Sequence, residues 1–279
     1  ISTSENRAKN FGLIGAAFGL GFIIGPVIGG LLGQYGPRVP FYAAAILCML
    51  NFLYGYFILP ESLDKENRRN FEWKRANPIG AFLHLKKYPN LMGLIIAIFI
   101  LYVGSHAVQS NWSFYTMYRF NWDERMVGIS LGIIGLLVGL VQGVLIRWIN
   151  PKIGNVKSIY IGLLLYTIGM FLFAFATESW MIFLFLIPYC LGGIAGPALQ
   201  AVVSENVKPS EQGEIQGVLA SLMSASAIIG PPMMAYVFYF FTHEDAPFKF
   251  PGAPFVLGGT LMLVSTVLAY RTLRKNHRK

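Results

Sequence analysis

Long apolar stretches recur along the whole chain and constrain its fold more than any other feature. An α-helix needs about 20 residues to cross the hydrocarbon core of a bilayer, which is about 30 Å thick. Eight stretches reach that length, at 11–33, 40–59, 91–117, 126–148, 157–176, 180–203, 213–241 and 253–271. Lipid offers no partner for open backbone groups, and the stretches are too long for barrel strands. We therefore predict an all-α membrane protein with eight transmembrane helices.

The scarcity and placement of charge support this prediction. Only 13% of the 279 residues are charged, against about 25% in soluble proteins. The net charge of +9 does not predict nucleic-acid binding, because the basic residues fall in short loops, where they set topology. With the amino-terminal end and every second loop in the cytoplasm, the opposite side keeps only four of the 22 Lys and Arg, namely Arg38, Arg119, Arg125 and Lys249. We predict that both termini of the chain are cytoplasmic.

A repeat links the first span to the seventh. The segment FGLIGAAFGLGFIIGP at 11–26 aligns without gaps with QGVLASLMSASAIIGP at 216–231, and small residues meet small residues along most of it. Repeats related by an axis along the membrane normal are typical of transporters with two six-helix halves. The first two spans would then match the last two, and four further spans are expected upstream. Convergence on a Gly-Pro helix kink is the alternative.

The repeat suggests a division of the chain. The longest loop, 61–90, separates two spans from six. We expect 1–60 to hold the last two helices of an amino-terminal half, 61–90 to be the cytoplasmic loop between halves, and 91–279 to be the six-helix carboxy-terminal half.

Glycines at four-residue intervals form a stripe along the first span. A smooth stripe lets a second helix approach closely, and a proline beside it bends the helix. The stripe consists of Gly21, Gly25, Gly29 and Gly33, with Pro26 beside it. The fourth span carries a matching set, Gly128, Gly132, Gly135, Gly139 and Gly143. We predict that these two spans pack together.

The motif formed by Gly21, Gly25, Pro26, Gly29 and Gly30 resembles the fifth-helix antiporter motif of the drug:proton antiporters in the major facilitator superfamily. Further stretches are similar to its tetracycline-resistance-type exporters: LPES at 59–62, FAFATESWM at 173–181 and GGIAGPALQAVVSENVKPSEQGEIQGVLASL at 192–222. The resemblance covers essentially the whole chain and begins just before the family's fifth helix. It implies a twelve-helix bundle of which helices 5–12 are present, with the motif acting in gating and packing between the halves.

The resemblance also implies a function. It predicts a secondary active transporter of the bacterial inner membrane that exports a small amphipathic, drug-like molecule in exchange for protons by alternating access. Such a protein contributes to antibiotic resistance, and we expect a monomer when full length. The acidic residue in the ninth helix of tetracycline exporters aligns with Tyr166, and a histidine of the eighth with Val138. The resemblance supports an exporter, and these departures argue against tetracycline as its substrate.

Polar residues on the third and fourth spans are the candidate substrate-binding residues. Such residues at bilayer depth must face protein or a water-filled cavity. They are Tyr102, His106, Gln109, Trp112 and Gln142, which we predict to line a cavity, with Trp112 as an apolar wall. A histidine ordinarily titrates near neutral pH, so His106 is the candidate for proton coupling. The alternatives are interhelical hydrogen bonds and a neutral histidine. Because all Asp and Glu lie in loops or at helix ends, the main coupling carboxylates are expected in the absent helices.

Other functions find less support. The sequence has no metal-ligand cluster, nucleophile arrangement or phosphate-binding loop, so we expect no enzyme, no cofactor and no metal. The expected partners are a small-molecule substrate, protons and the lipid bilayer, without nucleic acid. A nutrient symporter or uniporter of the same fold is one alternative, and a non-transporting membrane fragment is another.

Overall fold

Helices account for the regular structure throughout the part of the chain that the computed structural model describes. That part comprises residues 20–21, 24–58, 91–207, 212–246 and 248–276. Within it, seven helices are long and apolar enough to cross a membrane. The remaining predicted span, the first at 11–33, is described only at 20–21 and 24–33, and its end forms a short apolar helix, Ile24–Gly33. The prediction of an all-α membrane protein is confirmed.

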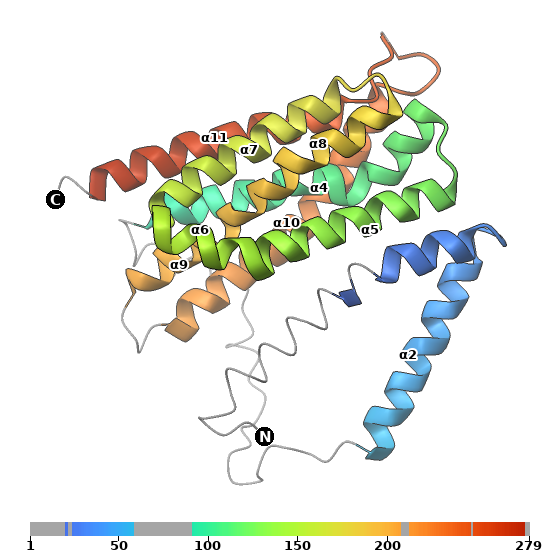
Figure 1. The fold of residues 1–279 in the computed structure, drawn as a ribbon, viewed down its shortest axis with the longest axis horizontal. Coiled ribbons are helices and arrows are strands. Elements are labelled where there is room, and N and C mark those ends of the chain that lie inside the picture. Colours follow the sequence, from blue (N-terminus) through green and yellow to red (C-terminus); the bar gives the residue numbers. More distant parts are fainter. Residues whose placement is uncertain (1–19, 22–23, 59–90, 208–211, 247, 277–279) are drawn as a thin grey trace. The chain divides into compact units, whose positions relative to one another are not determined.

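The helices follow the predicted spans closely, with breaks in two of them (Figure 1). In chain order they are α2 (Val39–Ile58), α4 (Met92–Phe120), α5 (Glu124–Leu140), the π-helical segment η3 (Val141–Leu145), α6 (Ile146–Ile153), α7 (Asn155–Ala174), α8 (Ser179–Leu191), the 3₁₀ segment η4 (Gly192–Ile194), α9 (Ala195–Glu205), α10 (Gln212–Phe240) and α11 (Ala253–Asn276). The fourth predicted span is therefore α5, η3 and the start of α6. The sixth is α8, η4 and α9.

The chain divides into two compact units. One lies within Ile1–Asn77 and Trp122–Leu136, and the other within Pro78–Asn121 and Leu137–Lys279. Most of α5 thus belongs to the first unit, although it continues into the second. The division expected from the sequence stays a prediction, and its loop at 61–90 lies wholly outside the described residues.

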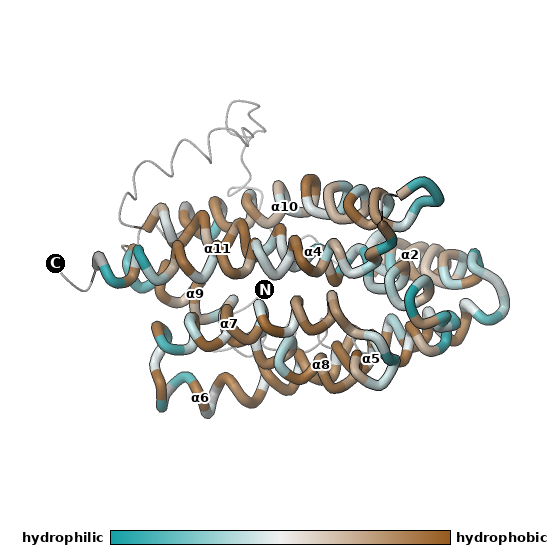
Figure 2. The backbone as a smooth tube through the Cα atoms, turned by 90° about the horizontal axis from the view of Figure 1, so that it is seen from above, coloured by the Kyte–Doolittle hydropathy of each residue, from teal (hydrophilic) through white to brown (hydrophobic). Residues whose placement is uncertain are grey.

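In the larger unit, α4 packs against α10 and α11, and α7 packs against α8, α9 and α11. Figure 2 shows apolar residues along the middle of these helices and hydrophilic residues mainly near their ends. Small residues bring α4 and α11 together, because a Cβ atom at Gly258 would lie 3.1 Å from the Gly104 carbonyl oxygen. Ser265 in α11 also donates a hydrogen bond of 2.8 Å to the carbonyl oxygen of Ala97 in α4. Close backbone approach and interhelical hydrogen bonds are typical of membrane bundles.

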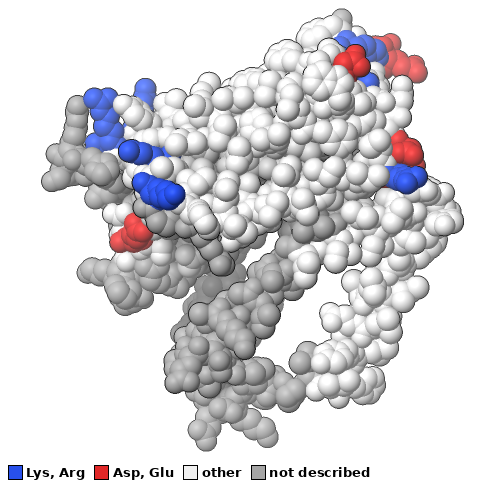
Figure 3. Space-filling model, in the orientation of Figure 1, with Lys and Arg blue, Asp and Glu red and all other residues white. Residues whose placement is uncertain are grey.

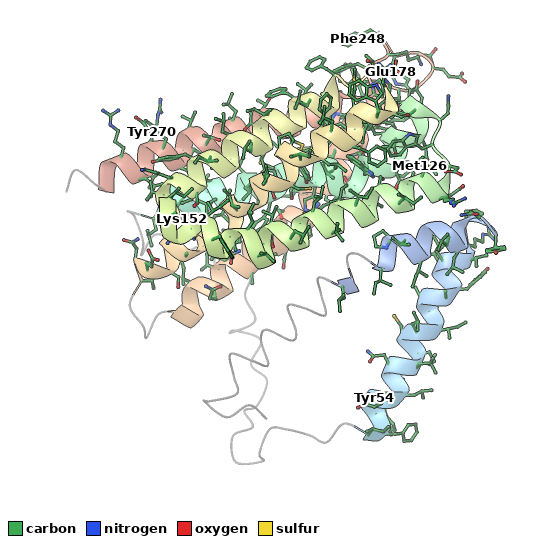
Figure 4. All side chains as sticks on the ribbon, viewed as in Figure 1. Tyr54, Met126, Lys152, Glu178, Phe248 and Tyr270 are labelled. Carbon is green, nitrogen blue, oxygen red and sulfur yellow. The ribbon has the colours of Figure 1, made fainter. Side chains whose placement is uncertain are left out.

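Charge gathers at the two ends of the larger unit. The face in Figure 3 has Lys, Arg, Asp and Glu near the helix ends and a wide uncharged zone between them. Figure 4 places Lys152 and Tyr270 at one end, and Glu178 and Phe248 at the other. This pattern fits helices that cross a bilayer in alternating directions.

In the smaller unit, a turn at Gly36 joins the helix Ile24–Gly33 to α2. Gly36 has φ of +135°, a conformation that side-chain-bearing residues rarely adopt. No residue of α2 is buried, although the helix is strongly apolar. Such a surface fits lipid or other apolar partners better than water.

Candidate functional site

Two of the predicted spans are broken inside the larger unit, and the breaks touch each other. The π-helical segment η3 contacts the 3₁₀ segment η4. Segments of π-helix are rare and are often found at functional sites. Irregular backbone at membrane depth is tolerated where protein buries it or where it lines a water-filled cavity. The place where η3 and η4 meet is therefore the first candidate for a site.

Polar groups surround Gly193 at this meeting point. A Cβ atom at Gly193 would lie 3.5 Å from Nε2 of Gln142 and 3.7 Å from the hydroxyl oxygen of Tyr166. Gln142 is exposed, and Tyr166 is partly buried. Neither side chain hydrogen bonds to any residue that the structure describes. An amide and a phenol without protein partners thus face one small space beside the backbone of η4.

A hydrogen-bonded pair flanks this space. Gln200 of α9 donates a hydrogen bond of 2.9 Å to the Tyr102 hydroxyl of α4. The pair joins α4 to α9, and α9 also packs against η4 and against α7, which carries Tyr166. The structure therefore brings the predicted residues Tyr102 and Gln142 into one cluster, together with Tyr166 and Gln200. We call these four residues and Gly193 the polar cluster.

Two other predicted residues, His106 and Gln109, continue along α4. The His106 ring lies against Gly230 of α10, where a Cβ atom would overlap it. Gln109 is exposed, and its Nε2 donates a hydrogen bond of 3.2 Å to Ser105 of the same helix. His106 thus contacts the Gly-Pro step of the repeat, which the sequence did not indicate.

The structure places Trp112 away from the polar cluster. Its side chain is only 2% exposed, and its ring packs edge-on against Phe173 of α7 and Phe255 of α11, with ring centroids 5.2 Å and 6.5 Å away. These contacts place Trp112 in the packed interior between three helices instead of on a cavity wall. Residues spaced by three or four positions share a helix face. Trp112 follows Tyr102 by ten positions, so the two side chains can face different neighbouring helices.

The glycine motif makes a close contact inside the smaller unit. A Cβ atom at Gly30 would lie 2.8 Å from the Gly128 Cα of α5, and one at Gly33 would lie 3.2 Å from the Glu124 Cβ. The packing of the first span against the fourth is therefore confirmed. The contact runs through Pro26, Gly30 and Gly33, since the Pro26 carbonyl also faces Gly128.

Of the predicted stripe, Gly33 alone takes part in this described contact, and the role of the stripe as a whole stays a prediction. Cβ atoms at Gly21, Gly25 and Gly29 would meet no described atom within 4 Å. Pro26, Gly30 and Gly33 are spaced by four and three residues, so they also lie on one helix face. Spacing alone did not distinguish this face from its neighbour.

Sequence reasoning missed Tyr166, Gln200 and Gly193 as candidates. Gln200 is a polar residue in an apolar span, and that signal could have found it. Gly193 belongs to the stretch GGIAGP, whose three glycines precede a proline and could have indicated a break. Tyr166 was noted only as the position that aligns with the acidic residue in the ninth helix of tetracycline exporters, and it was not made a candidate because tyrosine is common in membrane helices.

Comparison with known proteins places this arrangement in a family. The model of the Major Facilitator Superfamily matches residues 1–187 and 145–279, which together cover the whole chain. The chain belongs to the major facilitator superfamily.

Relatives within the superfamily are tetracycline resistance proteins. The chain is 35% identical over 264 residues to the class C protein of Escherichia coli, a match that covers 95% of this chain and 65% of that protein. It is 30% identical over 280 residues to the class H protein of Pasteurella multocida, covering 99% of this chain and 68% of the relative. The chain thus spans about two thirds of the length of these relatives.

A solved major facilitator structure shares the fold. The crystal structure of the human organic anion transporter TETRAN matches with a TM-score of 0.68 and 24% identity, covering 96% of this chain and 65% of the other. Among the residues that our structure describes, no group of three or more His, Cys, Asp or Glu could hold a metal ion.

Proposed function

We propose that this major facilitator chain acts in a secondary active transporter that exports a small amphipathic molecule in exchange for protons. The identity to tetracycline resistance proteins carries the proposal, since it extends over 99% of this chain in the class H protein. The expected setting is a bacterial inner membrane, with both termini of this chain in the cytoplasm and a monomer as the working form.

Alternating access requires two states of the bundle and a site that opens to either side. The glycine contact between the helix Ile24–Gly33 and α5 supports a role of the antiporter motif in packing and gating. The broken helices at η3 and η4 support local adjustment near the polar cluster. Of the five residues predicted to line a cavity, Tyr102, His106, Gln109 and Gln142 are proposed to contact the substrate, and Trp112 is left out because it is buried.

Proton coupling needs a group that titrates under working conditions. His106 is the one histidine within the described membrane helices, and its ring makes no hydrogen bond to a described residue. We propose it as a proton carrier in this chain. Because the His106 ring contacts Gly230, a change in the charge of the ring would act directly on α10.

Proteoliposomes that contain the purified full chain test the proposed function. An acidic lumen should drive tetracycline or another amphipathic probe inward while protons leave, and a protonophore should abolish the movement. Protein-free liposomes control for passive permeation. Movement of probe and protons in the same direction would instead indicate a symporter, and an unchanged rate relative to protein-free liposomes would reject transport.

A further inference from the structure

Unpartnered polar side chains in the membrane interior mark the polar cluster as a binding site. Polar side chains at membrane depth face protein or a water-filled cavity. The amide of Gln142 and the hydroxyl of Tyr166 both lie within 4 Å of the Cβ position of Gly193, and neither bonds to a described residue. A bound molecule or water must supply their partners at this depth.

The cluster also has a distinct chemical character. Its four side chains are two amides and two phenols, and none carries a fixed charge. Gln200 already donates to Tyr102, so the Gln142 amide and the Tyr166 hydroxyl are the groups left to bind a ligand. Both can donate a hydrogen bond, and a carbonyl or hydroxyl oxygen can accept from both.

Gly193 makes room for that oxygen. Any larger residue would place its side chain between Gln142 and Tyr166, because the nearest atoms to the Cβ position belong to them and to Val141. The π-helical turn at η3 and the 3₁₀ turn at η4 bring these groups together across two spans. A site built in this way recognises an oxygen acceptor by the direction of its hydrogen bonds and by the space available to it, and it needs no opposite charge.

We propose that Gln142 and Tyr166, on either side of Gly193, determine specificity by binding a carbonyl or hydroxyl oxygen on an uncharged part of the exported molecule. The Tyr102–Gln200 pair forms the adjoining wall. This inference rests on the proposed function, because it names the class of solute for the same transporter.

Equilibrium binding to the purified full chain in nanodiscs tests the proposal without a proton gradient. Two probes separate the chemistry: tetracycline carries many carbonyl and hydroxyl oxygens, whereas ethidium is an aromatic cation without oxygen. The variants are Tyr166→Phe, which removes one oxygen atom, and Gln142→Leu. Tyr160→Phe is the matched control, since it removes the same atom from α7 where the ring contacts Tyr270. Each test variant should weaken tetracycline binding about threefold to tenfold, as expected for one hydrogen bond.

Ethidium affinity should stay unchanged in every variant, and Tyr160→Phe should match the parent protein for both probes. The proposal is overturned if Tyr166→Phe and Gln142→Leu leave tetracycline binding unchanged, if they weaken both probes equally, or if the parent protein binds only ethidium. Gln142 is exposed, so Gln142→Leu should leave the folded protein intact. This variant therefore still tests the proposal if Tyr166→Phe lowers the yield of folded protein. If the variants show the expected binding but the proteoliposomes show no proton exchange, the proposed function is rejected and the site is retained. If proton exchange occurs but the variants bind tetracycline like the parent protein, the site is rejected and the proposed function is retained.

Discussion

The contact between Gly30 and Gly128 offers a sharp test of helix packing in the smaller unit. A Cβ atom at Gly30 would lie 2.8 Å from both the Gly128 Cα and the Glu124 carbonyl oxygen. Non-bonded carbon atoms prefer a separation of about 3.5–4.0 Å, so Gly30→Ala would push the two helices apart by about 0.7–1.2 Å. Overpacking of this kind costs about 1–3 kcal/mol.

The neighbouring glycine supplies the control. A Cβ atom at Gly29 would meet no described atom within 4 Å. Alanine is about 1 kcal/mol better than glycine inside a helix, and this gain applies to both substitutions. The difference between Gly30→Ala and Gly29→Ala therefore isolates the overlap, and we expect Gly30→Ala to be less stable by about 1–3 kcal/mol.

Fluorine NMR of fluorotryptophan-labelled protein during a denaturant titration in micelles would measure this difference. Trp122 precedes α5 within the same unit and reports its unfolding locally. Equal stability of the two variants would refute the packing of these helices through Gly30. Greater loss in Gly29→Ala would instead support the stripe predicted from the sequence.

Two further expectations concern the larger unit. Replacing His106 by Asn should abolish the release of protons on probe binding, measured with a pH dye in weakly buffered micelles; unchanged release would exclude His106 as the carrier. Gly252→Ala should lower the free energy of unfolding by about 1–3 kcal/mol, because the new Cβ atom would overlap the Ala174 carbonyl, whereas Gly196→Ala, with open space around it, should not. Thermal unfolding followed by circular dichroism compares the two, and similar losses would contradict the overlap.

The helical nature of the chain followed from local information. Each span predicted from hydropathy corresponds to a described helix or, for the first, to its described end. This success has a physical cause, since a bilayer forces every backbone group to find its partner within the segment. The breaks at Val141–Leu145 and Gly192–Ile194 were not predicted, because their backbone geometry depends on the helices packed around them.

The candidate site could be predicted only in part. Tyr102 and Gln142 were found because polar residues are rare in apolar spans. Their neighbour Gln200 is 98 residues from Tyr102 along the chain, and no local pattern pairs residues so far apart. Trp112 looked like a cavity residue from its position on α4, but Phe173 and Phe255 from two other helices enclose it.

The sequence by itself determined that this chain crosses a membrane as helices, and its motifs indicated the superfamily. Only the tertiary structure decided which face of each helix meets a partner. Gly29 and Gly30 are neighbours in the sequence, yet a Cβ atom at Gly29 would meet no described atom within 4 Å, whereas one at Gly30 would meet α5. Successive residues point about 100° apart around a helix, so the rotation of each helix about its axis assigns every side chain its role. That rotation is set by packing between helices and is not encoded in any single span.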